Sequence, residues 1–157
     1  MAEDLSRFHG LTRSQLMARI RSRGNKKTEV VMVALLRANG ITGWRRHQPL
    51  PGRPDFIFRR ERVALFVDGC FWHGCPRHYR PPTSSRSFWR EKVETNRSRD
   101  LRVTRALRKA GWTVVRVWEC ALTRRASART VGRIVRALAR GLAGTRSVSR
   151  GSVAFSR

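Results

Sequence analysis

The sequence predicts a single α/β domain, in which a central β-sheet is flanked by helices. Two short apolar runs, 55–58 and 63–68, lie on either side of a polar turn, as adjacent buried strands do. Three longer segments carry apolar residues at helical spacing, namely 29–39, 87–110 and 126–143. At 157 residues the chain has the length of one domain, which we expect to span residues 1–143.

The first 27 residues are polar and strongly basic. We expect a mobile arm with one helical turn near residues 13–20. Such an arm either contacts a phosphate backbone or is merely solvated, and the composition favours neither interpretation. A helix follows, with Thr28 as its expected cap and Glu29 in its first turn, and it ends at Gly40.

The sheet is predicted to begin with a short edge strand over residues 44–50. A turn over 50–54 follows, because Gly52 stands there between two prolines. The runs 55–58 and 63–68 then form an antiparallel hairpin. After a long loop and a helix, a further strand at 112–119 precedes the last helix. We expect the Gly/Ser/Arg-rich tail, residues 144–157, to be disordered.

Asp55 opens the first hairpin strand and Asp68 closes the second. Since the ends of an antiparallel pair lie side by side, both carboxylates can face one point in space. Oxygen ligands of this kind suit Mg²⁺, which neutralises a scissile phosphodiester. Acidic residues are scarce, so these two, with Glu29 on the first helix, form a candidate catalytic metal site. The alternative is ordinary turn and cap chemistry.

The loop over residues 69–86 is too long to be structureless inside a compact domain, and a metal ion could hold it. Cys70, Cys75 and His78 lie in this loop and Cys120 follows the last strand, which gives the four ligands of a structural Zn²⁺ site. His73 is free in this arrangement; if His73 were a ligand, His78 would not be one. Alternatively, the thiols are small buried hydrophobic groups.

Four aromatic residues lie in or next to the same loop: Phe71 and Trp72 within it, and Phe88 and Trp89 where it enters the next helix. Apolar wedges inserted between base steps unstack and kink DNA, and arginines beside these rings could hold the phosphates. The alternative is that the rings pack in the core, the usual place of large apolar side chains.

The charge balance indicates a polyanionic partner. The chain has 35 Lys and Arg against ten Asp and Glu, a formal charge of +25, while its 40% hydrophobic content is that of a folded protein. Nucleic acid is favoured over an anionic membrane surface, although codon bias also enriches arginine. Without a long apolar run or a signal-like N-terminus, we expect no membrane association and a cytoplasmic, nucleoid-associated protein.

Four blocks of sequence, taken in order, are more specific than any of these patterns. They are LPGRPDF (50–56), FVDGCFWHGC (66–75), FWREKVETNRSRD (88–100) and GWTVVRVWEC (111–120). They resemble the signature blocks of the very-short-patch-repair (Vsr) DNA mismatch endonucleases, and MARIRS (17–22) with Glu29 resembles the N-terminal segment of that family. The similarity covers about residues 13–140.

The resemblance implies a restriction-endonuclease-like (PD-(D/E)xK) α/β fold, with a central mixed sheet flanked by helices and a structural zinc site. It also implies an activity: Mg²⁺-dependent, strand-specific nicking of duplex DNA 5′ to the T of T:G mismatches, which arise by deamination of 5-methylcytosine. The implied partners are double-stranded DNA and mismatch-repair proteins, and single-strand nicking favours a monomer.

Carried over to this sequence, the resemblance assigns Asp55 and the main-chain carbonyl of Val67 to Mg²⁺. It matches His73 to the histidine that activates the attacking water and Glu29 to an acidic helper, with Asp68 as a further candidate. The family's intercalating aromatics match Phe71, Trp72 and Trp89, while Met17 lies near a further wedge in an arm where Arg19 and Arg21 would contact DNA.

Two departures from the family pattern matter. The residue after Val67 is commonly His in the family and is Asp68 here, so either the metal gains a carboxylate or a phosphate-facing histidine is lost. The zinc loop typically has the pattern C-x4-H-x-C, whereas this chain has Cys75 at the position of the histidine and Arg77 at that of the cysteine. His78, one residue later, can restore the four ligands.

Two further hypotheses stay open at this point. The first is a nickase of phage defence or of a mobile element, built on the same scaffold with different target recognition. The second is a non-catalytic, zinc-stabilised DNA-binding protein, against which the complete set of Glu29, Asp55 and His73 argues.

Overall fold

A computed structural model of the protein describes residues 28–83 and 86–150, with side chains up to residue 143. The predicted basic arm, with Met17, Arg19 and Arg21, lies outside the described residues, and so does the end of the tail after residue 150. None of the described helices has both the length and the apolar character that a membrane span requires.

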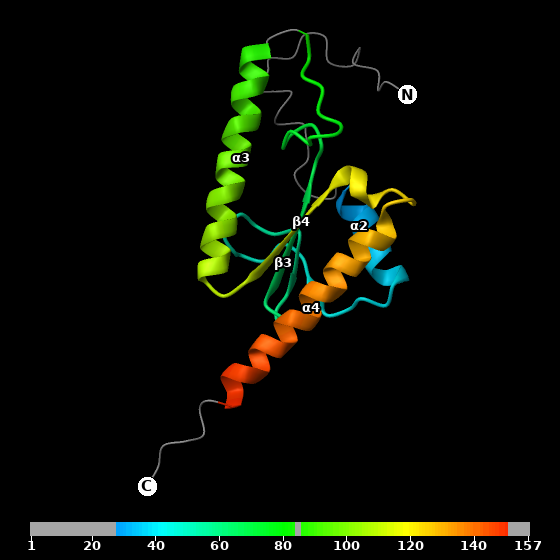
Figure 1. Cartoon of the computed structure of the whole chain (residues 1–157), viewed down its shortest axis with the longest axis vertical. Coiled ribbons are helices and arrows are strands. Elements are labelled where there is room, and N and C mark those ends of the chain that lie inside the picture. Colours follow the sequence, from blue (N-terminus) through cyan, green and yellow to red (C-terminus); the bar gives the residue numbers. More distant parts are fainter. Residues whose placement is uncertain (1–27, 84–85, 151–157) are drawn as a thin grey trace.

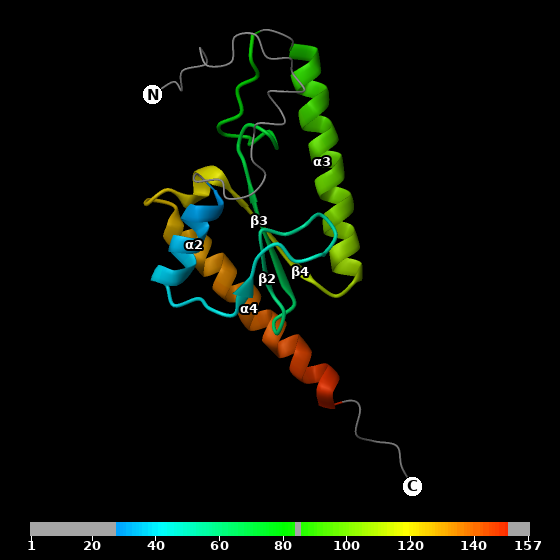
Figure 2. The ribbon, with the colours of Figure 1, turned by 180° about the vertical axis from the view of Figure 1, so that it is seen from behind.

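The described residues form three layers, with a sheet between helices (Figures 1 and 2). Helix α3 (Arg86–Lys109) covers one face of the sheet, and α2 (Glu29–Ala38) and α4 (Ser127–Arg150) cover the other. The four described strands are ordered β1 (Trp44–Arg45), β2 (Phe56–Phe58), β3 (Val63–Asp68) and β4 (Thr113–Trp118).

The sheet is mixed, as predicted. Strands β1, β2 and β3 form an antiparallel meander, whereas β4 runs parallel to β3. A parallel neighbour requires a crossover connection, and α3 supplies it. The C-terminal ends of β3 and β4 and the N-terminal end of β2 therefore lie at the same end of the sheet, and the candidate site lies there.

Alternation along β3 and β4 decides which side chains reach which layer. Val63, Leu65, Val115 and Val117 belong to the core shared with α2 and α4. Ala64, Phe66 and Val114 pack toward Leu107 and Val103 of α3. Continuing the same alternation, Asp68 and Arg116 also lie on the face covered by α3.

The α2 helix begins at the predicted residue, but the prediction for its cap was wrong. The Thr28 side chain makes no capping hydrogen bond, because its backbone (φ −120°, ψ −70°) does not have the extended geometry of an N-cap. Instead, the carbonyl oxygen of Thr28 accepts a hydrogen bond of 2.9 Å from the Met32 N–H.

Two other boundaries differ from the prediction. The edge strand β1 has two residues rather than seven, since His47 adopts a positive φ of 55° and Pro49 has no N–H to donate. Helix α4 continues to Arg150, beyond the expected end at residue 143, because no proline interrupts it. Residues 144–150 are therefore helical rather than disordered.

Two glycines of α4 give a matched test of how this helix packs. A Cβ at Gly141 would lie 1.9 Å from the Glu61 carbonyl oxygen in the β2–β3 turn, whereas one at Gly132 would lie 3.5 Å from its nearest neighbour outside the helix backbone, a nitrogen of the Arg136 side chain. We expect Gly141→Ala to lower the free energy of unfolding by about 1–3 kcal/mol, the usual range for overpacking. Gly132→Ala should raise it by about 0.5–1 kcal/mol through helix propensity. Urea unfolding of both variants measures these changes, and stabilisation by Gly141→Ala would contradict the close approach.

Candidate active site and metal centre

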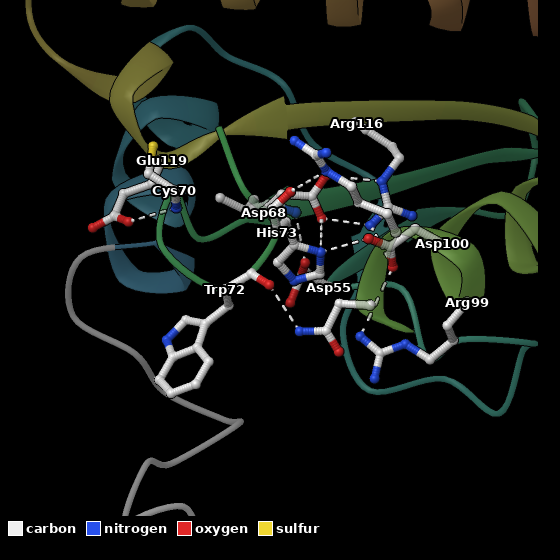
Figure 3. Close-up of polar contacts among 12 residues, drawn as sticks. Asp55, Asp68, Cys70, Trp72, His73, Arg99, Asp100, Arg116 and Glu119 are labelled. Atoms are coloured by element: carbon white, nitrogen blue, oxygen red, sulfur yellow. Dashed lines mark hydrogen bonds and ion pairs between the residues drawn. The ribbon is translucent and has the colours of Figure 1, made fainter. Parts of the chain in front are cut away.

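A cavity of about 960 Å³ lies at the end of the sheet where β3 finishes. Its walls come from the turn before β2, the end of β3, the following loop and the middle of α3. Asp55, Asp68 and His73 all line this cavity, so the structure brings together three of the residues predicted as catalytic (Figure 3).

Asp55 is placed by the turn that precedes β2. Gly52 in this turn has a φ of 73°, and a Cβ there would come within 2.4 Å of a methyl carbon of Val103 on α3, so only glycine fits. The Val67 N–H donates a hydrogen bond of 2.7 Å to the Asp55 carboxylate. The start of β2 and the end of β3 therefore lie side by side, as predicted.

Burial raises the pKa of Asp55 to about 6. The hydrogen bond from the Val67 N–H acts in the opposite direction, whereas the negative charges of Glu29 and Asp68 raise the pKa further. An ionised carboxylate in this position lacks sufficient positive compensation. A divalent cation would supply it, so this site fits a metal ion.

Asp68 also lies at the cavity, but both its oxygens are bound by Arg116 of β4. The guanidinium donates from Nε to Oδ2 at 2.8 Å and from Nη2 to Oδ1 at 2.5 Å. Arg116 was not among the predicted site residues. A signal was nevertheless present, because Arg116 is a lone cation within an otherwise apolar strand pattern.

The imidazole of His73 is paired with Asp100 of α3, another residue that sequence reasoning missed. The distance between His73 Nδ1 and Asp100 Oδ2 is 2.5 Å. Burial acts to raise the pKa of Asp100, but the hydrogen bond with His73 and the charges of His73, Arg116 and Arg99 outweigh it, so this pKa is lowered. With Nδ1 facing an ionised carboxylate, Nε2 is the ring nitrogen available to a molecule in the cavity.

Two further residues of α3 hold the turn that carries His73. Asn96 donates a hydrogen bond of 2.8 Å to the Trp72 carbonyl oxygen, and Arg97 donates one of 2.6 Å to that of Gly74. Asn96 and Asp100 are four residues apart and so project from one face of α3. This spacing explains why the block at 88–100 is tied to the loop at 69–75.

Glu29 is buried, 3% exposed, but it does not line the cavity. Its Oε1 accepts a hydrogen bond of 2.8 Å from Nε of Arg46, and His47 Nε2 lies 3.3 Å away. Its influence on the cavity is electrostatic, through the raised pKa of Asp55.

The four predicted zinc ligands converge in space. Single ligand atoms of Cys70, Cys75, His78 and Cys120 all lie within 4.8 Å of one another. Cys120 comes from a short 3₁₀ helix, η2 (Glu119–Leu122), which directly follows β4. The Sγ atoms of Cys75 and Cys120 are 3.8 Å apart. A tetrahedral ion with Zn–S bonds of about 2.3 Å separates two sulfurs by about 3.8 Å, so this cluster has the dimensions of a metal site.

The thiol of Cys75 is the most acidic of the cluster. Burial acts to raise its pKa, but hydrogen bonds with the His78 side chain and with backbone groups of Arg77 and His78 lower it to about 6. Burial raises the pKa of Cys70 and of Cys120. Since thiolates are the metal-binding form, Cys75 offers a ligand that is already ionised at neutral pH.

The aromatic residues form one half-buried cluster beside the cavity. The ring centroid of Phe71 lies 5.1 Å from that of Trp72 and 5.0 Å from that of Trp89, and the two tryptophans are 5.9 Å apart. Trp72 also lines the cavity. These rings lie outside the two core clusters and pack mainly on one another.

Fold and site together indicate a nuclease, since a histidine–aspartate pair and a half-buried carboxylate, that of Asp55, share one cavity of a strongly basic α/β protein. Comparison with known families agrees: the family model described as DNA mismatch endonuclease Vsr matches residues 6–78. The chain belongs to this Vsr family, as its resemblance predicted, and it is an endonuclease.

Curated relatives match over different lengths. The type II nicking enzyme V.XorIIP of Xanthomonas oryzae pv. oryzae is 42% identical over 113 residues, which cover 71% of this chain and 82% of that protein. The DNA mismatch endonuclease Vsr of Escherichia coli is 38% identical over 112 residues, 71% of each chain. The type II nicking enzyme V.NaeI of Lentzea aerocolonigenes is 49% identical over 67 residues, and the match spans only 40% of that protein.

Replacing Asp55 by Asn should stabilise the metal-free protein at neutral pH. Folding raises this pKa from 3.8 to about 6, so the folded state binds more protons than the unfolded state within this window. The stability due to this group is present below about pH 4 and is lost as the pH rises through 6. We expect Asp55→Asn to add about 1–3 kcal/mol to the free energy of unfolding at pH 7.5, and little at pH 4, by urea unfolding in EDTA.

Asp100→Asn is the matched control, with the opposite sign. The folded state lowers the pKa of Asp100, so its stabilising contribution is present above its ordinary pKa and is lost as the pH falls. This variant should therefore be less stable than the wild type at pH 7.5. Destabilisation of equal size by both substitutions would contradict the pKa shift of Asp55.

Proposed function

We propose that the protein is a Mg²⁺-dependent nickase that cleaves one strand of duplex DNA 5′ to the T of a T:G mismatch. We further propose that its α/β core is a restriction-endonuclease-like (PD-(D/E)xK) scaffold. The observation that carries the proposal is the convergence of Asp55, the end of β3 and the His73–Asp100 pair on one cavity, in a chain of the Vsr family.

Asp55 and the main-chain carbonyl of Val67 are the proposed ligands of Mg²⁺. A bound Mg²⁺ supplies charge neutralisation at the scissile phosphate. The raised pKa of Asp55 supports this role, because the carboxylate is poor in compensating charge without a cation. Asp68 was a third candidate ligand, but its ion pair with Arg116 favours a different role, which is developed below.

His73 is the proposed general base. Its Nδ1 faces Asp100, which fixes the tautomer that leaves Nε2 free to accept a proton from the attacking water. The turn at 69–75 is held by Asn96 and Arg97, so the imidazole is presented by a fixed backbone. Glu29 acts at a distance in this scheme, through its negative charge.

Double-stranded DNA is the proposed substrate and partner. The formal charge of +25 supplies contacts to phosphates. Trp72 and Trp89, with Phe71 packed against both, are the proposed wedges that enter the base stack. The basic arm, with Met17, Arg19 and Arg21, would add a further contact, and nicking of a single strand needs only one copy of the chain.

A structural Zn²⁺ ion is the proposed occupant of the Cys/His cluster. Three thiols and one imidazole form a typical closed tetrahedral ligand set for Zn²⁺. Ions that prefer oxygen ligands, such as Mg²⁺, do not suit it. A Zn²⁺ ion held by Cys120 and by the three loop ligands would then tie the long connection after β3 to the end of β4.

A second candidate function has its own support. Several relatives, among them V.XorIIP and V.NaeI, are type II nicking enzymes by name. This chain also departs from the family pattern at Asp68 and in the order of its zinc ligands. The alternative is therefore a nickase with a different target, serving phage defence or a mobile element.

A nicking assay separates these functions. Labelled duplexes with a T:G mismatch, an A:C mismatch or no mismatch are incubated with Mg²⁺ or EDTA. We expect cleavage of the T:G duplex alone, 5′ to the T and only with Mg²⁺.

Loss of Asp55 should reduce the rate about 10³-fold and loss of His73 about 10²–10⁴-fold, whereas Glu91→Ala, on the exposed side of α3, serves as the control. Cleavage regardless of mismatch would favour the second function, and full activity of Asp55→Ala would reject the site.

Metal analysis tests the ligand set of the Cys/His cluster. The purified protein should contain about one equivalent of zinc, the stoichiometry of one four-ligand site. His78→Ala and Cys120→Ala should lose it and melt at lower temperature, because the loop loses its tether. His73→Ala is the matched control and should retain zinc. Loss of zinc from His73→Ala with retention by His78→Ala would reverse the assignment.

A further inference from the structure

Arg116 occupies a position where the strand pattern favours an apolar side chain. Its cross-strand partner in β3 is Phe66, and Val114 precedes it on the same face. The guanidinium lies 4.7 Å from the centroid of the Phe66 ring, and its Nη1 is buried without a hydrogen-bond partner among the described residues. A cation in apolar packing is costly unless it is paired, so this position requires an explanation.

The ion pairs of Arg116 join three elements. Its Nε and Nη2 bind the two oxygens of Asp68 on β3, and Nη2 also lies 3.0 Å from Oδ1 of Asp100 on α3. A planar guanidinium can bridge two carboxylates in this way, whereas a lysine ammonium cannot reproduce the fork. Arg116 therefore fixes the distance between the end of β3 and the middle of α3.

The chain of contacts ends at the imidazole of His73 (Figure 3). Oδ1 of Asp100 faces Arg116, and Oδ2 of the same carboxylate faces His73 Nδ1 at 2.5 Å. Because a carboxylate is planar, holding one oxygen fixes the direction of the other. Asp68 also faces the imidazole directly, but at a longer distance of 3.8 Å between its Oδ1 and His73 Nδ1. The shorter contact, and with it the orientation of His73, depends on Arg116 through Asp100.

We infer that Arg116 is a positioning residue for the proposed nicking reaction: anchored on Asp68, it holds Asp100 and thereby orients His73 toward the cavity. Asp68 is then the anchor of Arg116 rather than a ligand of Mg²⁺. The kinetic consequence rests on the proposed function, whereas the orientation of His73 can be measured without it.

Kinetics test the catalytic consequence. Arg116→Met should lower kcat about 100-fold, the cost of a small misplacement of a reacting group, with KM for DNA unchanged, because Arg116 acts through His73. Arg116→Lys should be intermediate. Arg133→Met is the matched control: Arg133 donates to the main-chain carbonyl of Arg116 from the exposed side of α4, and its loss should change kcat less than about fivefold, the limit for an exposed polar contact.

A double-mutant cycle distinguishes the two roles of Asp68. If Asp68 acts only through Arg116, the Asp68→Asn/Arg116→Met double variant has the kcat of Arg116→Met alone, and Mg²⁺ dependence matches the wild type. Arg116→Met alone leaves the buried Asp68 carboxylate without its partner and could fold poorly for that reason. The double variant removes this unpaired charge. A weaker response of Asp68→Asn to Mg²⁺ would make Asp68 a metal ligand. Additive losses would give Asp68 a role apart from Arg116, such as its direct contact with His73. Either result would overturn the inference.

Nitrogen NMR of the histidine rings supplies a readout that does not require activity. In ¹⁵N-labelled wild type at a pH where His73 is neutral, we expect one tautomer, with the proton on Nδ1; a His73→Asn sample assigns the signals. The Asp68→Asn/Arg116→Met variant should show averaging between tautomers, while Arg133→Met retains one. A single unchanged tautomer in the double variant would reject the positioning role. Absence of nicking by the wild type would reject the proposed function instead.

Discussion

The parallel pairing of β3 with β4 is the constraint on which both candidate sites depend. This pairing sets Asp68 opposite Trp118, so the segments that follow the two strands leave the sheet together. The loop after β3 carries Cys70 and the turn after β4 carries Cys120, which is why residues 50 positions apart can share one metal ion. The same register places Arg116 beside Asp68 on the face covered by α3.

Helix α3 is both the crossover that makes this pairing possible and the support of the loop that carries His73. Its apolar residues Val103 and Leu107 pack on the sheet, while Asn96 and Asp100, one to two turns earlier, reach the loop and its histidine. Displacement of the helix along its axis would therefore move Asp100 relative to Arg116 on β4. The packing of α3 on the sheet therefore fixes the position of Asp100 at the cavity.

The elements were predictable from sequence because each has a strong local signal. The hairpin at 55–68 and the three long helices follow from runs and spacings of apolar residues. Asp55 and the cysteines were found because acids and thiols are scarce or clustered, whereas the role of His73 was predicted from the resemblance to the Vsr family. Asp100 and Arg116 were missed because each is one polar residue within a helix or strand, and their meeting depends on tertiary packing that no local pattern encodes. The prediction for the Thr28 cap failed for a similar reason. The backbone angles of Thr28, which the sequence does not show, decide whether its hydroxyl can accept a hydrogen bond from the first turn of α2.

The acids at and near the cavity influence one another, although the protein has a formal charge of +25. Asp55, Asp68 and Glu29 lie close enough for their charges to raise the pKa of Asp55, a cost that a fold selected for stability alone would avoid. Arg116 offsets this charge for Asp68 and Asp100 but leaves Asp55 largely uncompensated. The internal cation thus divides the acids at the cavity into a paired group, which contacts the imidazole, and a single carboxylate, Asp55, to which we assign the proposed external cation. This division follows from where one guanidinium lies.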